Sequence, residues 1–190
     1  MSDHYLEGEL VENKDFQENT WKTGEYDDCH FSNCSFHEVD LSQSVFAECT
    51  FENCDLSMAQ LQGTALKDVR FEQCKLLGLR FEDCHPFLLQ MEFMGCQLTY
   101  SSFHGLKLKG TRFTNCQMEE ADFSQADLTG AHFDQCNLAR TLFDNTLLDK
   151  ADFRTAYHYT IHPEHNYLNG AKFSQDGVQG LLNHLNITIE

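Results

Sequence analysis

The sequence predicts an all-β solenoid with a square cross-section, and three regularities support this fold class. A large apolar residue returns at every fifth position, in a first series that runs to Phe81 and a second series that starts at Phe93. A small residue or a cysteine often stands two positions before it. Cysteine pairs recur at a separation of four of these periods. Together, these spacings describe a chain that turns once per period and closes a coil after four turns.

Neither regular secondary structure can place a period of five on one face. In an α-helix, five residues rotate the side chain by about 500°, so each apolar residue lies roughly 140° from the previous one. In a straight strand the side chains alternate between faces, so an odd period sends successive apolar residues to opposite sides. The chain therefore has to change direction within every period, with the central apolar residue pointing at a common axis.

The cysteines and some polar residues indicate how many periods make a coil. All nine cysteines lie two positions before a central position: Cys29, Cys34, Cys49, Cys54, Cys74, Cys84, Cys96, Cys116 and Cys136. Five pairs of them are separated by four periods, as Cys29 and Cys49 are, and Asn13, Asn33, Asn53 and Gln73 follow the same spacing. We therefore expect four pentapeptides per coil, with stacked coils paired like neighbouring strands about 4.8 Å apart.

The remaining segments are predicted in order along the chain. Residues 1–10 are expected to cap the first coil, and residues 11–173 carry the repeat. The two apolar series differ in phase by two residues, so residues 85–92 (HPFLLQME) contain an insertion. We expect Pro86, Phe87 and Leu88 in a bulge or small loop. The apolar side chains of Phe87, Leu88 and Leu89 either pack locally or form a contact patch.

Residues 174–190 lose the period of five. A short helix is expected there, with Val178, Leu181, Leu182 and Leu185 at helical spacing, followed by NITIE as a short strand. The end of a solenoid exposes its core. This segment is therefore expected either to cover the last coil or to provide a self-association surface.

The repeat resembles that of the pentapeptide-repeat family, whose consensus is A(D/N)LXX or A(D/N)FXX. It reads most clearly as ADFSQ, ADLTG, AHFDQ and CNLAR over residues 121–140, and as ADFRT over residues 151–155. The resemblance extends over about residues 11–173. It implies the family fold, a right-handed quadrilateral β-helix. The central Phe or Leu then fills the axis, and the small residue two before it points inward at a corner.

The chain is strongly acidic, with a formal net charge of −17 that is unevenly distributed. Residues 1–60 contain 14 acidic and 2 basic side chains, whereas residues 61–190 contain 16 and 11. The spacing of one coil stacks outward carboxylates in two columns, namely Asp28, Glu48 and Asp68, and Glu12, Glu52 and Glu72, the second interrupted by Ser32. Such a surface repels nucleic acids and membranes and attracts basic surfaces. Net charge also keeps a protein soluble, which is the alternative explanation.

The sequence contains none of the catalytic or nucleotide-binding motifs that we sought, and an axis filled with Phe leaves no pocket. We therefore expect a protein that is not an enzyme and binds no cofactor. CxxC is absent, and nine cysteines in a cytosolic chain are expected to be free thiols. Three histidines in the repeat gap AYHYTIHPEHNYL, His158, His162 and His165, are either ordinary loop residues or ligands of a transition metal.

Within the family, the chain is most similar to the branch that protects DNA gyrase, namely the albicidin-, microcin B17- and quinolone-resistance proteins. The length is close, the repeat phase breaks in the middle, and residues 156–174 resemble a crossover segment of the albicidin and microcin members. The large loops of some quinolone-resistance members are missing, so the resemblance does not imply quinolone protection in particular. The tail LLNHLNITI resembles the dimerisation module of this branch. That likeness implies a dimer interface at Leu181, Leu182, Leu185, Ile187 and Ile189.

The resemblance implies a homodimeric DNA mimic that binds bacterial DNA gyrase or topoisomerase IV through its acidic columns. It would shield that enzyme from a poison, as antibiotic resistance or self-immunity, without contacting nucleic acid itself. The alternative is a non-enzymatic interaction scaffold with an unrelated protein partner. The acidic N-terminus is unlike a signal peptide, and no apolar run approaches the roughly 18–20 residues that span a bilayer. The expected location is therefore the cytoplasm.

Overall fold

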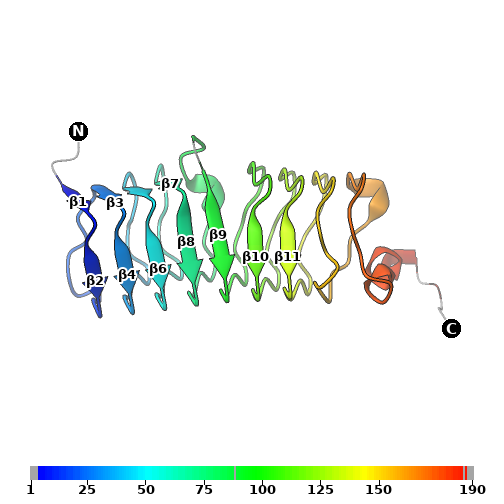
Figure 1. The fold of residues 1–190 in the computed structure, drawn as a ribbon, viewed down its shortest axis with the longest axis horizontal. Coiled ribbons are helices and arrows are strands. Elements are labelled where there is room, and N and C mark those ends of the chain that lie inside the picture. Colours follow the sequence, from blue (N-terminus) through cyan, green and yellow to red (C-terminus); the bar gives the residue numbers. More distant parts are fainter. Residues whose placement is uncertain (1–3, 88, 186, 188–190) are drawn as a thin grey trace.

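The computed structural model describes residues 4–87, 89–185 and 187, which form an elongated rod with its strands side by side along the axis (Figure 1). Within this part of the chain there are two parallel sheets. One has four strands: β1 (Tyr5–Glu7), β3 (Glu25–Asp27), β5 (Val45–Ala47) and β7 (Ala65–Lys67). The other has seven: β2 (Leu10–Glu12), β4 (His30–Ser32), β6 (Thr50–Glu52), β8 (Val69–Glu72), β9 (Met91–Met94), β10 (Arg112–Thr114) and β11 (His132–Asp134).

Neighbouring coils pair at the spacing that the cysteines predict. Phe31 in β4 is opposite Phe51 in β6, which lies four pentapeptides further along the chain. On the other two faces the same offset continues as isolated parallel bridges, such as Asp40 with Gln60. Each coil therefore has four sides and contains four pentapeptides. The predicted right-handed quadrilateral β-helix is confirmed.

Aromatic rings fill the axis of the rod and form its core. Phe113 is fully buried, and its ring stacks on Phe93 and on Phe133 with centroid distances of 5.1 Å and interplanar angles of 7°. Rings from an adjacent side, such as Phe123, meet this stack edge-on. Because offset stacking and edge contacts are the favoured geometries of aromatic pairs, the repeat aligns its Phe residues in the arrangement that stabilises them most.

The cysteines occupy the small inward corner position, where the chain turns. All nine are buried and free. The Cys54 thiol lies 3.3 Å from the carbonyl oxygen of Phe31 in the preceding coil, and burial raises the pKa of the Cys49 thiol to about 12. A thiol in such a site behaves as a small apolar residue that also donates a weak hydrogen bond. The expected free thiols are therefore packing residues.

The phase break appears in the structure as a change of register between β8 and β9. Val69 pairs with Met91 and Phe71 with Phe93, so the offset is larger here than the regular four pentapeptides seen between β6 and β8. The backbone nitrogen of His85 donates to the Thr64 carbonyl oxygen at 2.8 Å before the loop departs. Both strands keep their place in the seven-stranded sheet. The inserted residues are therefore accommodated by the loop, and the axis continues without a break (Figure 1).

The two ends of the rod differ from the sequence-based expectation. In the segment predicted as a cap, residues 1–10, the described part contains β1 and the start of β2, which pair with β3 and β4, and the capping role itself stays a prediction. The predicted C-terminal helix consists of two short 3-10 segments, η3 (Gly177–Leu181) and η4 (Asn183–Leu185). Ile187 lies in no strand, and the rest of the predicted strand falls outside the described residues.

Two further 3-10 turns lie within the rod, η1 (Phe81–Asp83) and η2 (Pro163–His165). None of the helical segments in the described part of the chain is long and apolar enough to cross a membrane.

Candidate partner-binding surfaces

The first acidic column lies on the corner between the two sheets. Asp28, Glu48 and Asp68 each follow a strand of the four-stranded sheet, and all three are exposed. The Asp28 nitrogen donates to the carbonyl oxygen of Ala47 at 2.9 Å, and the Glu48 nitrogen donates to that of Lys67 at 2.8 Å. These bonds hold the backbones of successive carboxylates at the spacing of neighbouring strands, about 4.8 Å. The column is therefore a regular line of charge.

The corner residues adopt a left-handed backbone conformation, with φ values of 49° at Asp28, 52° at Glu48 and 55° at Asp68. Gly8 occupies the same position one coil earlier with φ 63°. Such angles are unfavourable for residues with a Cβ atom and can mark a functional site. Here they recur at corners throughout the rod, so they belong to the fold and carry no functional information.

The second acidic column lies at the C-terminal ends of the strands in the seven-stranded sheet. The parallel register places Glu12 beside Ser32, Ser32 beside Glu52, and Glu52 beside Glu72. Ser32 is buried, so the column has a gap at β4. Glu52 contacts His30, with 3.0 Å between Oε2 and Nε2. The carboxylates of Glu12 and Glu72 make no ion pair within the described residues.

The two columns border the same stretch of sheet, β2 to β8. About four residues separate a corner carboxylate from the next glutamate along the chain, or roughly 13 Å at the usual rise of a strand. Asp28, Glu48 and Asp68 also make no ion pair among the residues that the structure describes. Five of the six predicted carboxylates are therefore uncompensated, on one side of the N-terminal half.

Carboxylates in the C-terminal half are paired much more often. Arg154 lies 2.7 Å from Asp152, and Lys109 lies 3.2 Å from Asp127. Hydrogen bonding to the Arg154 guanidinium holds the pKa of Asp152 below its ordinary value. Arg140 bridges Glu119 and Glu120 of the previous coil. The contrast shows that the acidic surface of the N-terminal half differs in its pairing as well as in its total charge.

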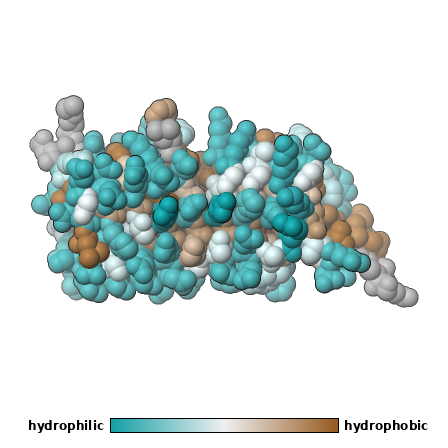
Figure 2. Space-filling model, in the orientation of Figure 1, coloured by the Kyte–Doolittle hydropathy of each residue, from teal (hydrophilic) through white to brown (hydrophobic). Residues whose placement is uncertain are grey.

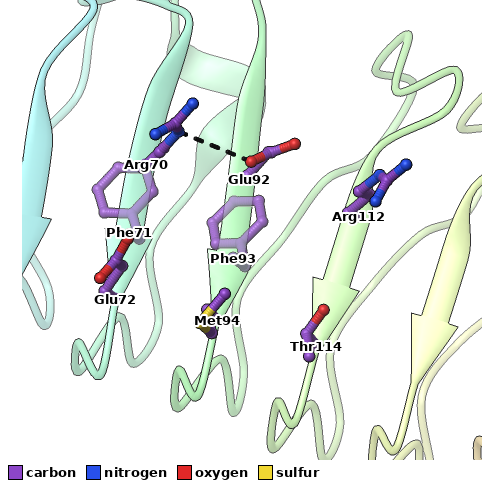
Figure 3. A pocket seen from close by; sticks show the side chains of 8 residues that line it. All are labelled: Arg70, Phe71, Glu72, Glu92, Phe93, Met94, Arg112 and Thr114. Carbon is purple, nitrogen blue, oxygen red and sulfur yellow. Dashed lines mark ion pairs between the residues drawn. The ribbon is translucent and has the colours of Figure 1, made fainter.

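A shallow pocket ends the acidic surface on the seven-stranded sheet. It has a volume of about 160 Å³ and crosses β8, β9 and β10 (Figure 3). Figure 3 shows Arg70 beside Glu92, with 3.8 Å between Arg70 Nε and Glu92 Oε2, and Arg112 on the next strand. Arg112 makes no ion pair in the described part of the chain. Arg70 therefore lies on the same strand as the last column residue, Glu72, and Arg112 lies two strands further along.

The apolar side chains of the insertion loop differ in burial, since one packs against the core and another is exposed to solvent. Phe87 has 65% of its surface exposed, whereas Leu89 packs against the core. Pro86 and Leu89 line a small pocket of about 150 Å³ together with Leu106 and Lys107. Leu88 lies outside the described residues. Leu89 therefore packs locally, and the contact role expected of the loop stays a prediction, for which Phe87 is exposed.

The C-terminal segment covers the last coil and also presents apolar residues to solvent. Leu181 is half-buried against the core, and the Ile161 nitrogen donates to the Gly180 carbonyl oxygen at 3.0 Å. Gly180 lies so close to Tyr159 that a Cβ atom there would be 2.5 Å from the Tyr159 carbonyl oxygen, so only glycine fits. The segment is thereby fixed on the last coil.

The outer side of this segment is apolar. Leu185 is 47% exposed and Ile187 is 55% exposed, while Leu182 is half-buried. Figure 2 shows hydrophobic surface at the C-terminal end of the rod, with smaller hydrophobic areas elsewhere on a mostly hydrophilic face. Ile189, the last residue of the predicted interface, lies outside the described residues. Exposed apolar surface at one end of a rod is typical of a protein–protein contact.

The structure does not bring together the three histidines singled out in the sequence. His158 Nδ1 contacts Asn137 Oδ1 at 3.1 Å, and His165 Nδ1 lies 3.6 Å from Asp144. His162 instead lies near Glu164 and His184, and one potential ligand atom of each lies within 4.8 Å of those of the other two. The sequence reasoning missed His184, although Glu164 and His184 are separated by the length of one coil.

Comparison with known proteins identifies the class to which this chain belongs. The pentapeptide repeat region family matches residues 19–86, 44–123 and 79–153, and the chain belongs to this family. A search of curated proteins finds no match.

The chain is also similar to solved structures, and the likeness to QnrB1 shows a shared fold. Full-length QnrB1, a plasmid-mediated fluoroquinolone resistance protein, is 18% identical with a TM-score of 0.51, covering 97% of this chain and 100% of its own. A trypsin-treated QnrB1 variant is 18% identical with a TM-score of 0.52, covering 100% of this chain and 92% of its own. HetL from the cyanobacterium Nostoc sp. strain PCC 7120 is 16% identical with a TM-score of 0.27, covering 90% and 84%.

Proposed function

We propose that this protein is a homodimeric DNA mimic that binds bacterial DNA gyrase or topoisomerase IV and protects it from a topoisomerase poison. The observation that carries the proposal is the pair of acidic columns in the N-terminal half, most of whose carboxylates have no partner within the described residues. The protein acts by binding and not by catalysis, in the cytoplasm, where its partner enzyme works. Its target surface is the basic saddle that normally holds duplex DNA.

The spacing of the charges supports mimicry of a duplex. B-DNA carries one negative charge per about 1.7 Å of its axis. Each column offers one carboxylate per coil of about 4.8 Å, and two columns together offer one per about 2.4 Å where neither is interrupted. The β-helix holds these positions, because the backbone nitrogens of Asp28 and Glu48 donate to carbonyl oxygens of the next coil. A basic surface that binds the DNA backbone would therefore meet a rigid array of negative charges that carries no nucleotide bases.

The C-terminal end supports a dimer. Leu181 anchors the segment, and the exposed Leu185 and Ile187 give it an apolar outer side. A second copy docked tail to tail on these residues would bury that surface and place an acidic half at each end of a rod twice as long. The fold likeness to QnrB1, a fluoroquinolone resistance protein, agrees with a resistance role. Phe87 on the insertion loop would add an apolar contact to the partner.

Charge reversal tests the proposal directly. The first variant reverses one column: Asp28→Lys, Glu48→Lys and Asp68→Lys. Binding to purified gyrase is measured by biolayer interferometry, and duplex DNA is added as a competitor. We expect wild-type binding that DNA displaces and that weakens with added salt, because the interaction is between exposed charges. The variant is expected to lose binding.

The matched control reverses three exposed carboxylates on other faces: Glu18→Lys, Glu38→Lys and Asp144→Lys. This control changes the net charge by the same amount as the column variant. If binding depends on the position of the carboxylates in the column, and not on the total charge, the control should retain binding. Equal loss in both variants would contradict a specific acidic surface. Absence of wild-type binding to gyrase and to topoisomerase IV would contradict the proposal and leave an interaction scaffold for another partner.

A further inference from the structure

His162, Glu164 and His184 converge where the repeat gap meets the C-terminal segment. His162 precedes η2, Glu164 lies within it, and His184 belongs to η4. One potential ligand atom from each residue lies within 4.8 Å of those of the other two. The imidazole rings of His162 and His184 have centroids 4.5 Å apart, and His184 Nε2 lies 3.2 Å from Glu164 Oε1.

The surrounding backbone holds both halves of this group in place. The Asn166 side-chain amide donates to the carbonyl oxygens of His162 and Phe143, both at 3.0 Å, which fixes the start of η2. On the other side, the hydrogen bond from Ile161 to Gly180 anchors the segment that leads to η4. The three side chains therefore meet because two anchored segments lie against each other, and not through a chance orientation of a free tail.

The hydrogen bonding of the group is incomplete. The His184 side chain is only 14% exposed, and its Nδ1 atom is buried with no hydrogen-bond partner among the described residues. A buried polar atom without a partner is destabilising. Two imidazoles packed together beside a carboxylate form a ligand set that suits zinc and neighbouring transition metals.

We propose that His162, Glu164 and His184 bind one divalent transition-metal ion, with Zn²⁺ as the best match. Zinc–nitrogen bonds of about 2.0–2.1 Å place tetrahedral ligands about 3.3 Å apart, so small side-chain rotations suffice to close the group around an ion. The ion bonds to one nitrogen of each imidazole and to one carboxylate oxygen of Glu164, and water completes the coordination. Its role is structural, because it ties η4 to η2 and so positions the segment that bears Leu185 and Ile187.

Calorimetric titration with Zn²⁺ alone tests the site, on the full chain without a histidine affinity tag. We expect one ion per chain and a higher midpoint of thermal unfolding in the presence of Zn²⁺. Titration with Co²⁺ should give visible bands of nitrogen and oxygen ligation. A strong thiolate charge-transfer band would instead show that cysteines bind the ion, and would overturn the proposal.

Single substitutions separate the site from its surroundings. Glu164→Gln and His184→Gln should each weaken Zn²⁺ binding at least about tenfold, as the loss of a direct ligand is no milder than the loss of a second-shell contact. The controls are His158→Gln and His165→Gln, since His165 stacks on His162 with centroids 5.6 Å apart yet lies outside the group. Glu164 is exposed, so Glu164→Gln gives a result even if His184→Gln fails to fold. No saturable binding, or the same loss in the controls, would overturn the proposal.

Discussion

Replacing Glu48 by glutamine should stabilise the fold, although Glu48 belongs to the surface proposed to bind the partner. Its side chain is exposed, and it stands between Asp28 and Asp68 in the first acidic column. Glutamine has the same length and suits the same corner, so the substitution removes the charge and little else. If the acidic surface served only solubility, a line of carboxylates that lowers stability would be unexpected. If the surface binds a partner, such a line is expected.

The magnitude follows from the spacing of the coils. Two unit charges about 4.8 Å apart in water repel by about 0.9 kcal/mol. Glu48 has two such neighbours, so removing its charge relieves about 1.7 kcal/mol without salt. Screening over a Debye length of about 8 Å at 0.15 M salt reduces this relief to about 1 kcal/mol. At 1 M salt the Debye length is about 3 Å, and about 0.3 kcal/mol remains.

The assay is urea unfolding of the wild type and Glu48→Gln at both salt concentrations, compared as free energies of unfolding. Glu120→Gln is the matched control, because Glu120 has the same corner conformation, with φ 56°, but accepts a hydrogen bond from Arg140 at 2.9 Å. The control should lose a little stability or none. The reasoning is refuted if Glu48→Gln gives no gain at 0.15 M salt, if its gain persists at 1 M, or if the control gains equally.

Three further predictions concern the core, one ion pair and the C-terminal end. Phe113→Ala should lower the free energy of unfolding, measured by urea unfolding, by about 3–5 kcal/mol, because the buried ring stacks on two others at 5.1 Å. A loss below about 1 kcal/mol would contradict an axis filled by aromatic rings. The folded pKa of Asp152 is depressed, so its contribution to stability is present above the unfolded pKa and is lost as pH falls through the folded pKa. Arg154→Gln should raise that pKa in an NMR titration, and an unchanged pKa would refute the assigned cause. The proposed dimer predicts that the wild type sediments as a dimer and that Leu185→Asp sediments as a folded monomer in analytical ultracentrifugation, whereas a retained dimer would exclude this interface.

The fold could be predicted from the sequence because one local rule is repeated in nearly every coil. A pairing such as Phe31 with Phe51 is distant in sequence, yet the cysteine spacing indicated its offset of four pentapeptides in advance. The same rule also located the register change before β9, because the insertion shifts every later apolar residue. Long-range contacts are usually the part of a fold that a sequence does not show. In a solenoid they follow from the period.

The ends could not be predicted with the same detail, since the rule stops there. The spacing of Leu181, Leu182 and Leu185 indicated a helix, but 3-10 turns satisfy the same spacing over so short a segment. Which of these residues faces the core depends on contacts around Tyr159 and Gly180, and no periodicity encodes these contacts. His184 was missed for the same reason, because its partners lie in a gap of the repeat.

The sequence also could not show which carboxylates of the acidic columns form ion pairs. Spacing alone stacked Glu12, Glu52 and Glu72, but it could not show that Glu52 contacts His30 while the other two lack an ion-pair partner within the described residues. Side-chain pairing depends on rotamers and on the neighbouring face. The structure therefore adds the observation on which the proposed function depends.

A supercoiling assay with purified bacterial gyrase tests the central claim most directly. The protein is titrated into reactions without inhibitor and into reactions poisoned by albicidin, microcin B17 or a fluoroquinolone. The proposed function predicts that wild-type protein restores supercoiling in at least one poisoned reaction, and that the column variant Asp28→Lys, Glu48→Lys and Asp68→Lys does not. Failure to restore activity in every poisoned reaction, with no effect on unpoisoned gyrase, would contradict the proposal that this acidic β-helix acts on the enzyme.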